Sequence, residues 1–246
     1  MAIEFIRPDW HVPDNVRAVS SARAGGLSAG AFSSLNLGDH VGDEPARVAA
    51  NRALLREQLQ LPAEPTWLVQ VHGCDVAAAR SDDGLAPLRA DAAVASRPGL
   101  VCAVMTADCL PALFCDEQGL VVAAAHAGWR GLLNGVLEAT ASRMGCPPER
   151  IIAWLGPAIG PAAFAVGGEV RDAFCYHSGE AEEAFVLGED ERWRADLYTL
   201  ARQRLAAAGV GRVSGGDCCT FSDRERFFSY RRDGRTGRMA SLIWLD

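Results

Sequence analysis

The apolar residues of this chain gather in short runs that are bounded by glycine, proline or polar residues. Several runs have the length of a strand, about four to eight residues: 66–71, 99–105, 120–125, 150–155 and 238–245. Other segments carry helical spacing or helix-terminal residues: 44–59, 128–144, 168–176 and 195–208. Because the strands and helices do not alternate strictly, the pattern favours an α+β fold over a doubly wound one.

A length of 246 residues is long for one domain but within the single-domain range. No repeat of fixed period and no low-complexity tract divides the chain, so we expect one domain over residues 1–246. No apolar run approaches the roughly 18 residues of a membrane span, and the N-terminus lacks the apolar region of a signal peptide. We therefore expect a cytoplasmic protein without membrane partners, and the sequence leaves protein partners open.

The charge of the chain restricts what it can bind and which reactions it can carry out. A net charge of −7 disfavours binding to nucleic acid, which needs a basic face. The chain contains no lysine, so its 24 basic residues are all arginine. Schiff-base chemistry and a Walker-A phosphate site are therefore excluded. Any bound anion must be held by arginine, by backbone N–H groups or by a metal ion.

Two histidines and one cysteine stand where three of the predicted strands end. His72 and His126 directly follow apolar runs and are followed by nearby glycines, and Cys109 lies in the loop after a third run. Functional groups often gather at such strand ends. Two imidazoles and one thiolate suit Zn²⁺, and three protein ligands leave a fourth position open for a reactant. The pattern predicts a catalytic zinc site, with copper as an alternative metal for the same ligands.

The same side chains allow other interpretations. Cys109 could be a nucleophile with His126 as its base, which would make the protein a cysteine hydrolase. Alternatively, the histidines are hydrogen-bonded structural residues and the cysteine belongs to the core. Multicopper oxidase chemistry needs His-x-His pairs, and this chain has none. Without a secretion signal, the eight cysteines are expected to be reduced, and most of them to be buried hydrophobic residues.

Four arginines are candidates for binding a substrate anion such as phosphate: Arg23, Arg130, Arg231 and Arg232. Arg23 lies in a glycine-containing loop that can present N–H groups to an anion, although an ordinary turn is an equal alternative. Arg130 lies at a predicted helix start, where backbone N–H groups favour anions. The other two lie in the segment 227–238 and could reach a phosphate. For Arg235 and Arg238 in that segment we expect only the charged tip of a hairpin.

Seven segments together resemble the YfiH-like laccase-domain proteins. They are Arg23-Ala-Gly-Gly-Leu-Ser28, Leu35-Asn-Leu-Gly38, Gln70-Val-His-Gly73, Thr106-Ala-Asp-Cys-Leu-Pro111, Ala125-His-Ala-Gly-Trp-Arg-Gly131, Gly156-Pro-Ala-Ile-Gly160 and Phe228-Ser-Tyr-Arg-Arg-Asp-Gly234. They cover nearly the whole chain in the order typical of the family. That family was long labelled polyphenol oxidase and is described as purine nucleoside phosphorylases that also deaminate adenosine.

The resemblance implies mixed β-sheets packed together and flanked by helices, a fold related to a bacterial toxin deamidase. It implies zinc held by His72, Cys109 and His126. The implied reactions are phosphorolysis of adenosine, inosine, guanosine or methylthioadenosine, and hydrolytic deamination of adenosine, so the expected partners are purine nucleosides and phosphate. We nominate Asp108 as the carboxylate that moves a proton. Some members are linked to editing of cell-wall precursors, which keeps a cysteine-type amidase with Cys109 and His126 as the alternative.

Overall fold

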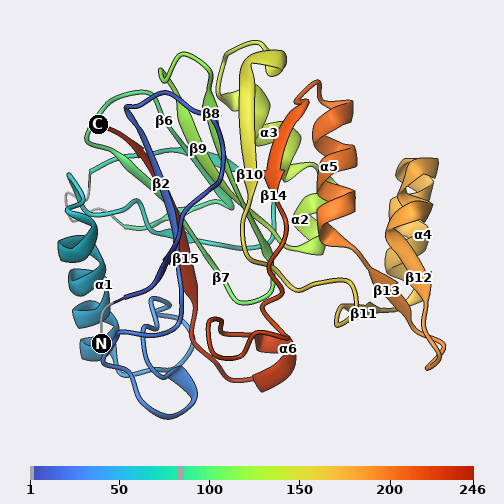
Figure 1. Ribbon diagram of the computed structural model, residues 1–246, viewed down its shortest axis with the longest axis horizontal. Coiled ribbons are helices and arrows are strands. Elements are labelled where there is room, and N and C mark those ends of the chain that lie inside the picture. Colours follow the sequence, from blue (N-terminus) through green and yellow to red (C-terminus); the bar gives the residue numbers. More distant parts are fainter. Residues whose placement is uncertain (1–2, 82–85) are drawn as a thin grey trace.

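The computed structural model describes residues 3–81 and 86–246, and its centre is a mixed six-stranded sheet (Figure 1). In order across the sheet, the strands are β14 (Arg212–Gly215), β10 (Ile151–Leu155), β8 (Leu110–Asp116), β9 (Val122–Ala127), β6 (Ala92–Ala95) and β4 (Val76–Ala78). The outer pairs, β10 with β14 and β4 with β6, are parallel, and the inner pairs are antiparallel.

A second, antiparallel sheet packs against the first. Its strands are β1 (Phe5–Ile6), β2 (Val16–Ser21), β15 (Met239–Leu245) and β7 (Val101–Thr106). Side chains of β8 alternate between two cores, as the pleat of a strand requires. Leu113 and Cys115 join the core between the sheets, while Leu110, Ala112 and Phe114 join the core under the helices. Both faces of the main sheet are therefore covered.

Helices close the outer faces of this sandwich (Figure 1). The helices α2 (Trp129–Asn134), α3 (Val136–Arg143) and α5 (Leu197–Ala207) pack on the main sheet. The helix α1 (Pro45–Leu59) packs on the second sheet, and its fully buried Leu55 shares a core cluster with Val101 and Leu242. A further, short helix, α6 (Tyr230–Asp233), precedes β15. None of the helices in the described parts of the chain has both the length and the apolar character needed to cross a membrane.

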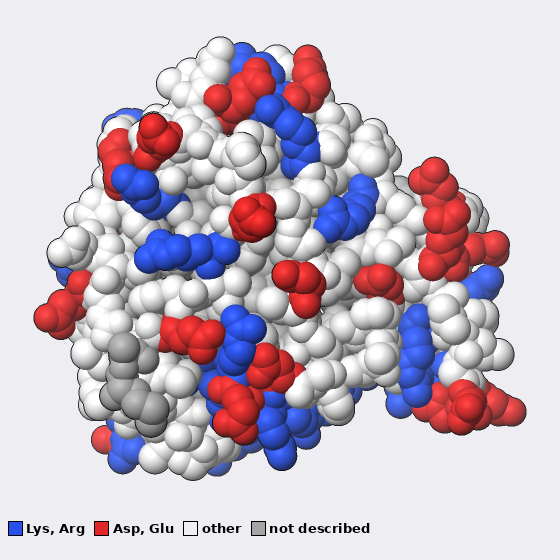
Figure 2. Space-filling model, in the orientation of Figure 1, with Lys and Arg blue, Asp and Glu red and all other residues white. Residues whose placement is uncertain are grey.

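A small lobe projects from the side of the molecule (right in Figure 1). It contains α4 (Gly168–His177) and a three-stranded sheet of β11 (Ala165–Val166), β13 (Trp193–Ala195) and β12 (Phe185–Leu187). Acidic side chains gather on it (Figure 2). The acidic residues of segment 179–184 lie on the 3-10 helix Gly179–Ala184, which leads into β12.

The predicted α+β class is confirmed, with differences in single elements. The helix predicted over 128–144 is two helices, because Gly135 has a φ of +98° and ends α2. The strand predicted over 66–71 is reduced to β3 (Leu68–Val69), which pairs with the equally short β5 (Leu88–Arg89). His126 lies inside β9 rather than after its end. A single domain over residues 1–246 stays a prediction.

Candidate metal centre

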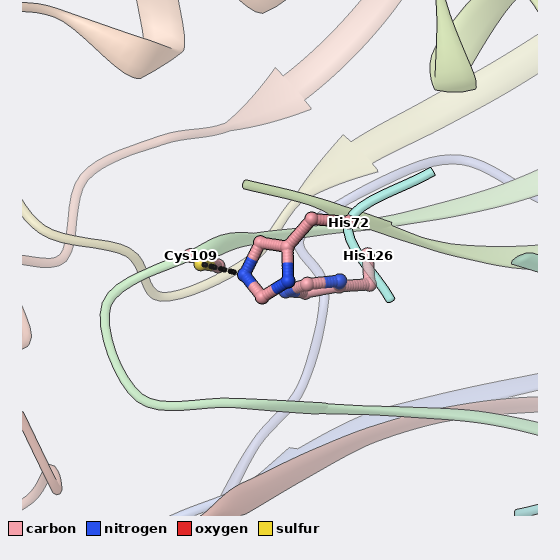
Figure 3. A group of neighbouring side chains, drawn as sticks. All are labelled: His72, Cys109 and His126. Carbon is pink, nitrogen blue, oxygen red and sulfur yellow. Dashed lines mark hydrogen bonds between the residues drawn. The ribbon is translucent and has the colours of Figure 1, made fainter. Parts of the chain in front are cut away.

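His72, Cys109 and His126 converge, although they come from three separate parts of the chain (Figure 3). Their ligand atoms all lie within 4.8 Å of one another, and Cys109 Sγ is 3.8 Å from His72 Nε2. The two imidazole rings meet edge to face, with centroids 4.8 Å apart. His72 is exposed, Cys109 is half-buried and His126 is buried. Such a cluster is compatible with a metal ion that solvent or a reactant can reach from one side.

The register of the main sheet brings two of these residues together. Pro111 of β8 pairs with His126 of β9, and continuing this antiparallel register places Cys109 opposite Gly128. A methyl group on Gly128 would lie 2.7 Å from His72 Cδ2 and 3.1 Å from Cys109 Sγ. These distances are shorter than a van der Waals contact, so only glycine fits between the ligands. Glycine at this position is therefore a steric requirement of the cluster.

Asp91 holds the two histidines of the cluster in place, although no local pattern in the sequence marks this residue. Its carboxylate is fully buried and accepts a hydrogen bond from His126 Nδ1 at 2.8 Å. It also accepts hydrogen bonds from the backbone N–H groups of Val71, His72 and Gly73, at 3.1, 2.9 and 2.7 Å. With Nδ1 of His126 bonded to a carboxylate, Nε2 is left to bind a metal ion. One carboxylate thus orients both histidines of the cluster.

The loop around His72 is held in an unusual backbone conformation. His72 has a φ of +60°, in the left-handed region that few residues other than glycine adopt. The three successive N–H groups that point at Asp91 compensate for the cost of this conformation. The side chain of His72 is thereby directed toward Cys109 (Figure 3).

Cys109, His126 and Asp91 stabilise one another's charged forms, and the pKa of each group shifts accordingly. Burial alone would raise the pKa of the Cys109 thiol, but the charge and hydrogen bond of His126, with help from His72, lower it to about 6. Burial acts to lower the pKa of His126, yet Cys109 and Asp91 together raise it. Desolvation opposes ionisation of Asp91, but its hydrogen bonds with His126 and Gly73 hold the pKa below the usual value. The thiolate, which is the form that binds metals or attacks substrates, is therefore favoured at neutral pH.

Asp108 precedes Cys109 and ties its loop to three other segments. It has a φ of +97°, and its buried carboxylate accepts hydrogen bonds from Thr220 Oγ1 and from the Arg231 backbone N–H, each at 2.6 Å. Its carbonyl oxygen accepts the Ile159 N–H at 2.9 Å. Both carboxylate oxygens thus already have partners in this structure. The proton-moving role nominated for Asp108 stays a prediction.

Arg23 is largely occupied by the protein itself. Its Nε and Nη2 donate to Ser33 O at 3.1 and 2.9 Å, and its Nη1 donates to Arg224 O at 3.0 Å. The guanidinium lies over the ring of Phe228, 4.7 Å from the centroid. These contacts hold two loops together, and they leave few N–H groups free for an anion. Anion binding by Arg23 stays a prediction.

The other three nominated arginines differ in how many hydrogen bonds their guanidinium groups already make within the protein. Arg232 donates to the carbonyl oxygens of Thr220, Phe221 and Phe227 and pairs with Asp233. Arg231 is exposed and donates to Ala165 O at 2.8 Å. Arg130 is exposed and lies over the Trp129 ring at the start of α2, next to the cluster in sequence. Their roles toward substrate also stay predictions.

Arg238 lies nearer the cluster than expected for the charged tip of a hairpin. It is half-buried and immediately precedes β15. Burial lowers the pKa of its guanidinium, and the charges of Cys109 and Asp108 act in the opposite direction. The sequence could not predict that Arg238 lies here, because local sequence does not distinguish the four arginines of the segment 227–238 from one another.

Comparison with known proteins places these residues in a family. A family model described as multi-copper polyphenol oxidoreductase laccase matches residues 17–246. The chain is 56% identical over 243 residues to a Pseudomonas aeruginosa protein named purine nucleoside phosphorylase, covering 98% of both. It is also 56% identical over 242 residues to a protein of Escherichia coli named purine nucleoside phosphorylase YfiH, covering 98% of this chain and 99% of that one.

Solved structures agree with this placement. A Neisseria meningitidis protein superposes with a TM-score of 0.93 at 52% identity, covering 98% of this chain and 99% of that one. The protein YlmD from Geobacillus stearothermophilus superposes with a TM-score of 0.91 at 31% identity, covering 98% of this chain and 96% of that one. This protein therefore belongs to the YfiH-like family of laccase-domain proteins.

Proposed function

We propose that this protein is a zinc-dependent purine nucleoside phosphorylase that acts in the cytoplasm and also deaminates adenosine. The convergence of His72, Cys109 and His126 on the buried Asp91 carries the proposal. The name purine nucleoside phosphorylase, borne by relatives that match the chain over nearly its full length, supports the substrate class. Eight free cysteines agree with a reducing compartment.

The chain's own side chains fit a zinc ion. Two imidazole nitrogens and one thiolate are the donor set that zinc prefers, and a ring held by a carboxylate is the usual support for a zinc-bound histidine. When bound, zinc supplies Lewis acidity at this position. Copper is an alternative ion for the same donors, because affinity alone favours copper over zinc.

In the proposed phosphorolysis, a phosphate oxygen forms a bond to C1′ of the ribose as the bond from C1′ to N9 of the purine breaks. The electron pair of the broken bond passes to the purine, which takes up the proton that phosphate brings. The products are ribose 1-phosphate and the free base. The protein must hold an anion beside the sugar, for which we nominate the arginines Arg23, Arg130, Arg231 and Arg232.

In the proposed deamination, a water oxygen forms a bond to C6 of adenosine and the amino group leaves as ammonia, which gives inosine. We nominate Asp108 as the carboxylate that moves the proton in this reaction. Adenosine, inosine, guanosine and methylthioadenosine share the purine and the glycosidic bond. We include all four as substrates for phosphorolysis.

A second function is favoured by a specific observation. The Cys109 thiol has a lowered pKa beside His126, and Asp91 orients that imidazole through Nδ1. This order of nucleophile, base and carboxylate is the arrangement of a cysteine hydrolase. A cysteine-type amidase, for example one that edits cell-wall precursors, is therefore the alternative.

Product analysis with adenosine, with and without phosphate, tests the proposal. Free adenine with ribose 1-phosphate, formed only when phosphate is present, would indicate phosphorolysis, and inosine would indicate deamination. The zinc enzyme should contain about one zinc per chain and lose both activities on chelation. Under the alternative, the chelated protein stays active on amide substrates and a thiol alkylator abolishes that activity.

A further inference from the structure

We infer that Arg238 binds the phosphate co-substrate, with the Nε and Nη2 edge of its guanidinium as the phosphate-binding face. This inference rests on the proposed phosphorylase function and concerns a residue whose sequence context predicts only the charged tip of a hairpin. Three observations lead to it: the position of Arg238 along the β15–β7 ladder, the contacts that hold its side chain, and the N–H groups that those contacts leave free.

The ladder places Arg238 beside the loop that carries Cys109. Met239 of β15 pairs with Thr106 of β7 in antiparallel register. One step further along the same register, Arg238 lies opposite Ala107, which directly precedes Asp108 and Cys109. The Arg238 N–H also donates to Asn36 Oδ1 at 2.9 Å, so the backbone is anchored on its other side. The position of Arg238 relative to the cluster is therefore set by the β15–β7 ladder and by the hydrogen bond to Asn36, and not by a free loop.

The side chain of Arg238 is held between neighbours that fix its direction. A methyl group on Gly38 would lie 2.8 Å from Arg238 Cγ, so the stem packs directly on the backbone of this glycine. The guanidinium carbon lies 5.9 Å from the centroid of the Tyr230 ring. Nη1 donates to Thr236 O at 3.1 Å and to Gly237 O at 3.0 Å. The ionisable groups whose charges act on this guanidinium are Cys109, Asp108 and Tyr230.

The remaining edge of the guanidinium has no partner in the protein. Within residues 3–81 and 86–246, Nε and Nη2 of Arg238 make no hydrogen bond and no carboxylate pairs with them. Asp108 is near, but its two oxygens already accept hydrogen bonds from Thr220 and from the Arg231 backbone. Cys109 and Asp108 act on this guanidinium only through their charges, and a half-buried guanidinium edge that makes no direct hydrogen bond or ion pair is costly. An anionic ligand would remove this cost.

Phosphate matches this edge in shape and charge. The Nε and Nη2 groups form the planar fork that binds two oxygens of a phosphate at once. The nominated Arg23 and Arg232 have their corresponding N–H groups on backbone carbonyl oxygens or on Asp233. Arg238 therefore offers a bidentate face, beside the residues of the proposed metal centre, that those two arginines lack.

The test compares Arg238→Gln and Arg238→Lys with Arg235→Gln, an exposed arginine of the same segment whose loss changes the net charge equally. We expect Arg238→Gln to weaken binding of inorganic phosphate, measured by calorimetry on the zinc-loaded protein, by about tenfold or more. The KM for phosphate should rise by a similar factor, while the KM for the nucleoside and the zinc content stay unchanged. Arg238→Lys should be intermediate, because it keeps the charge and loses the fork. Arg235→Gln should bind phosphate as the wild type does.

A measurement on the wild-type protein covers the case in which Arg238→Gln does not fold. Phosphate should protect Arg238 from an arginine-selective dicarbonyl reagent, with the modified peptide quantified by mass spectrometry. Absence of protection would overturn the inference, as would wild-type phosphate affinity in a folded Arg238→Gln protein. If Arg238 binds phosphate but no nucleoside yields ribose 1-phosphate, the phosphorylase function fails and the site stands. If ribose 1-phosphate forms with an unchanged KM for phosphate in Arg238→Gln, the site fails and the function stands.

Discussion

Asp91 and His126 lie opposite each other at the end of the β6–β9 ladder and are joined by two hydrogen bonds. The His126 N–H donates to the Asp91 carbonyl oxygen at 2.7 Å, and His126 Nδ1 lies 2.8 Å from Asp91 Oδ1. The same carboxylate holds the backbone of the loop that carries His72. A single residue outside the cluster of His72, Cys109 and His126 thus sets the direction of two of its three side chains.

Asp91→Asn should therefore weaken metal binding without removing a ligand. An amide has one acceptor oxygen in place of two, so either His126 Nδ1 and the His72 N–H, or the Val71 and Gly73 N–H groups, lose their acceptor. We expect the zinc affinity to fall about 10–100-fold, measured by competition with a chromophoric chelator. Asp75→Asn is the matched control, because Asp75 is exposed and contacts Asp91 only through its backbone carbonyl oxygen. Wild-type zinc affinity in Asp91→Asn would show that the carboxylate does not orient the ligands.

The reactivity of Cys109 should depend on pH in a way that ordinary cysteines do not show. A pKa lowered to about 6 means that the thiolate persists in more acidic solution than the roughly 8.5 of a free cysteine allows. In chelator-treated protein, alkylation of Cys109 by iodoacetamide should reach half its maximal rate near pH 6, followed by peptide mass spectrometry. Cys175, whose pKa is raised by burial, is the internal control.

His126→Asn should move the alkylation profile of Cys109 toward alkaline pH, since the charge of His126 is the main influence that lowers this pKa. The direction follows because the thiolate loses the positive charge that stabilises it. A Cys109 profile that resembles a free cysteine in the wild type would contradict the thiolate–imidazolium pair.

Gly128→Ala should disrupt the centre while leaving most of the fold intact. The added methyl group would collide with His72 and Cys109, because it would lie 2.7 Å from His72 Cδ2 and 3.1 Å from Cys109 Sγ. We expect loss of most zinc binding, measured by metal analysis after dialysis, together with a far-ultraviolet spectrum like that of the wild type. Gly168→Ala is the control, because a methyl group there meets nothing within 4 Å, and it should bind zinc normally. Full zinc occupancy in Gly128→Ala would mean that the ligands adapt.

Substitution of Asp108 separates its structural role from its proposed proton-moving role. Asp108→Ala removes the acceptor for Thr220 Oγ1 and the Arg231 N–H and places alanine at a positive φ, so we expect a loss of about 1–3 kcal/mol in the free energy of unfolding. Asp108→Asn keeps one acceptor and tolerates this φ, so its stability should be closer to the wild type. The measurement is urea denaturation alongside the rate of adenosine turnover. A stable but inactive Asp108→Asn supports proton transfer, and a stable, fully active one refutes it.

Local pattern was enough to predict much of the secondary structure and the three ligand candidates. The apolar run at 150–155 corresponds to β10, and the segment at 44–59 corresponds to α1, because length and periodicity are local properties. His72, Cys109 and His126 stood out because each follows an apolar run. Arrangement of these runs into two sheets could not be read locally, since each ladder joins residues far apart in the chain.

What the sequence determined by itself was which residue types are available for chemistry and near which strand ends they lie. Only the tertiary structure decided how they meet. Asp91 is 35 positions from His126, and Arg238 reaches the Cys109 loop through the pairing of the last strand with β7. Strand register has a period of two residues and depends on packing across the whole sheet. A charged residue beside an apolar run can therefore orient a candidate metal ligand, or bind an anion, only when that strand register has formed.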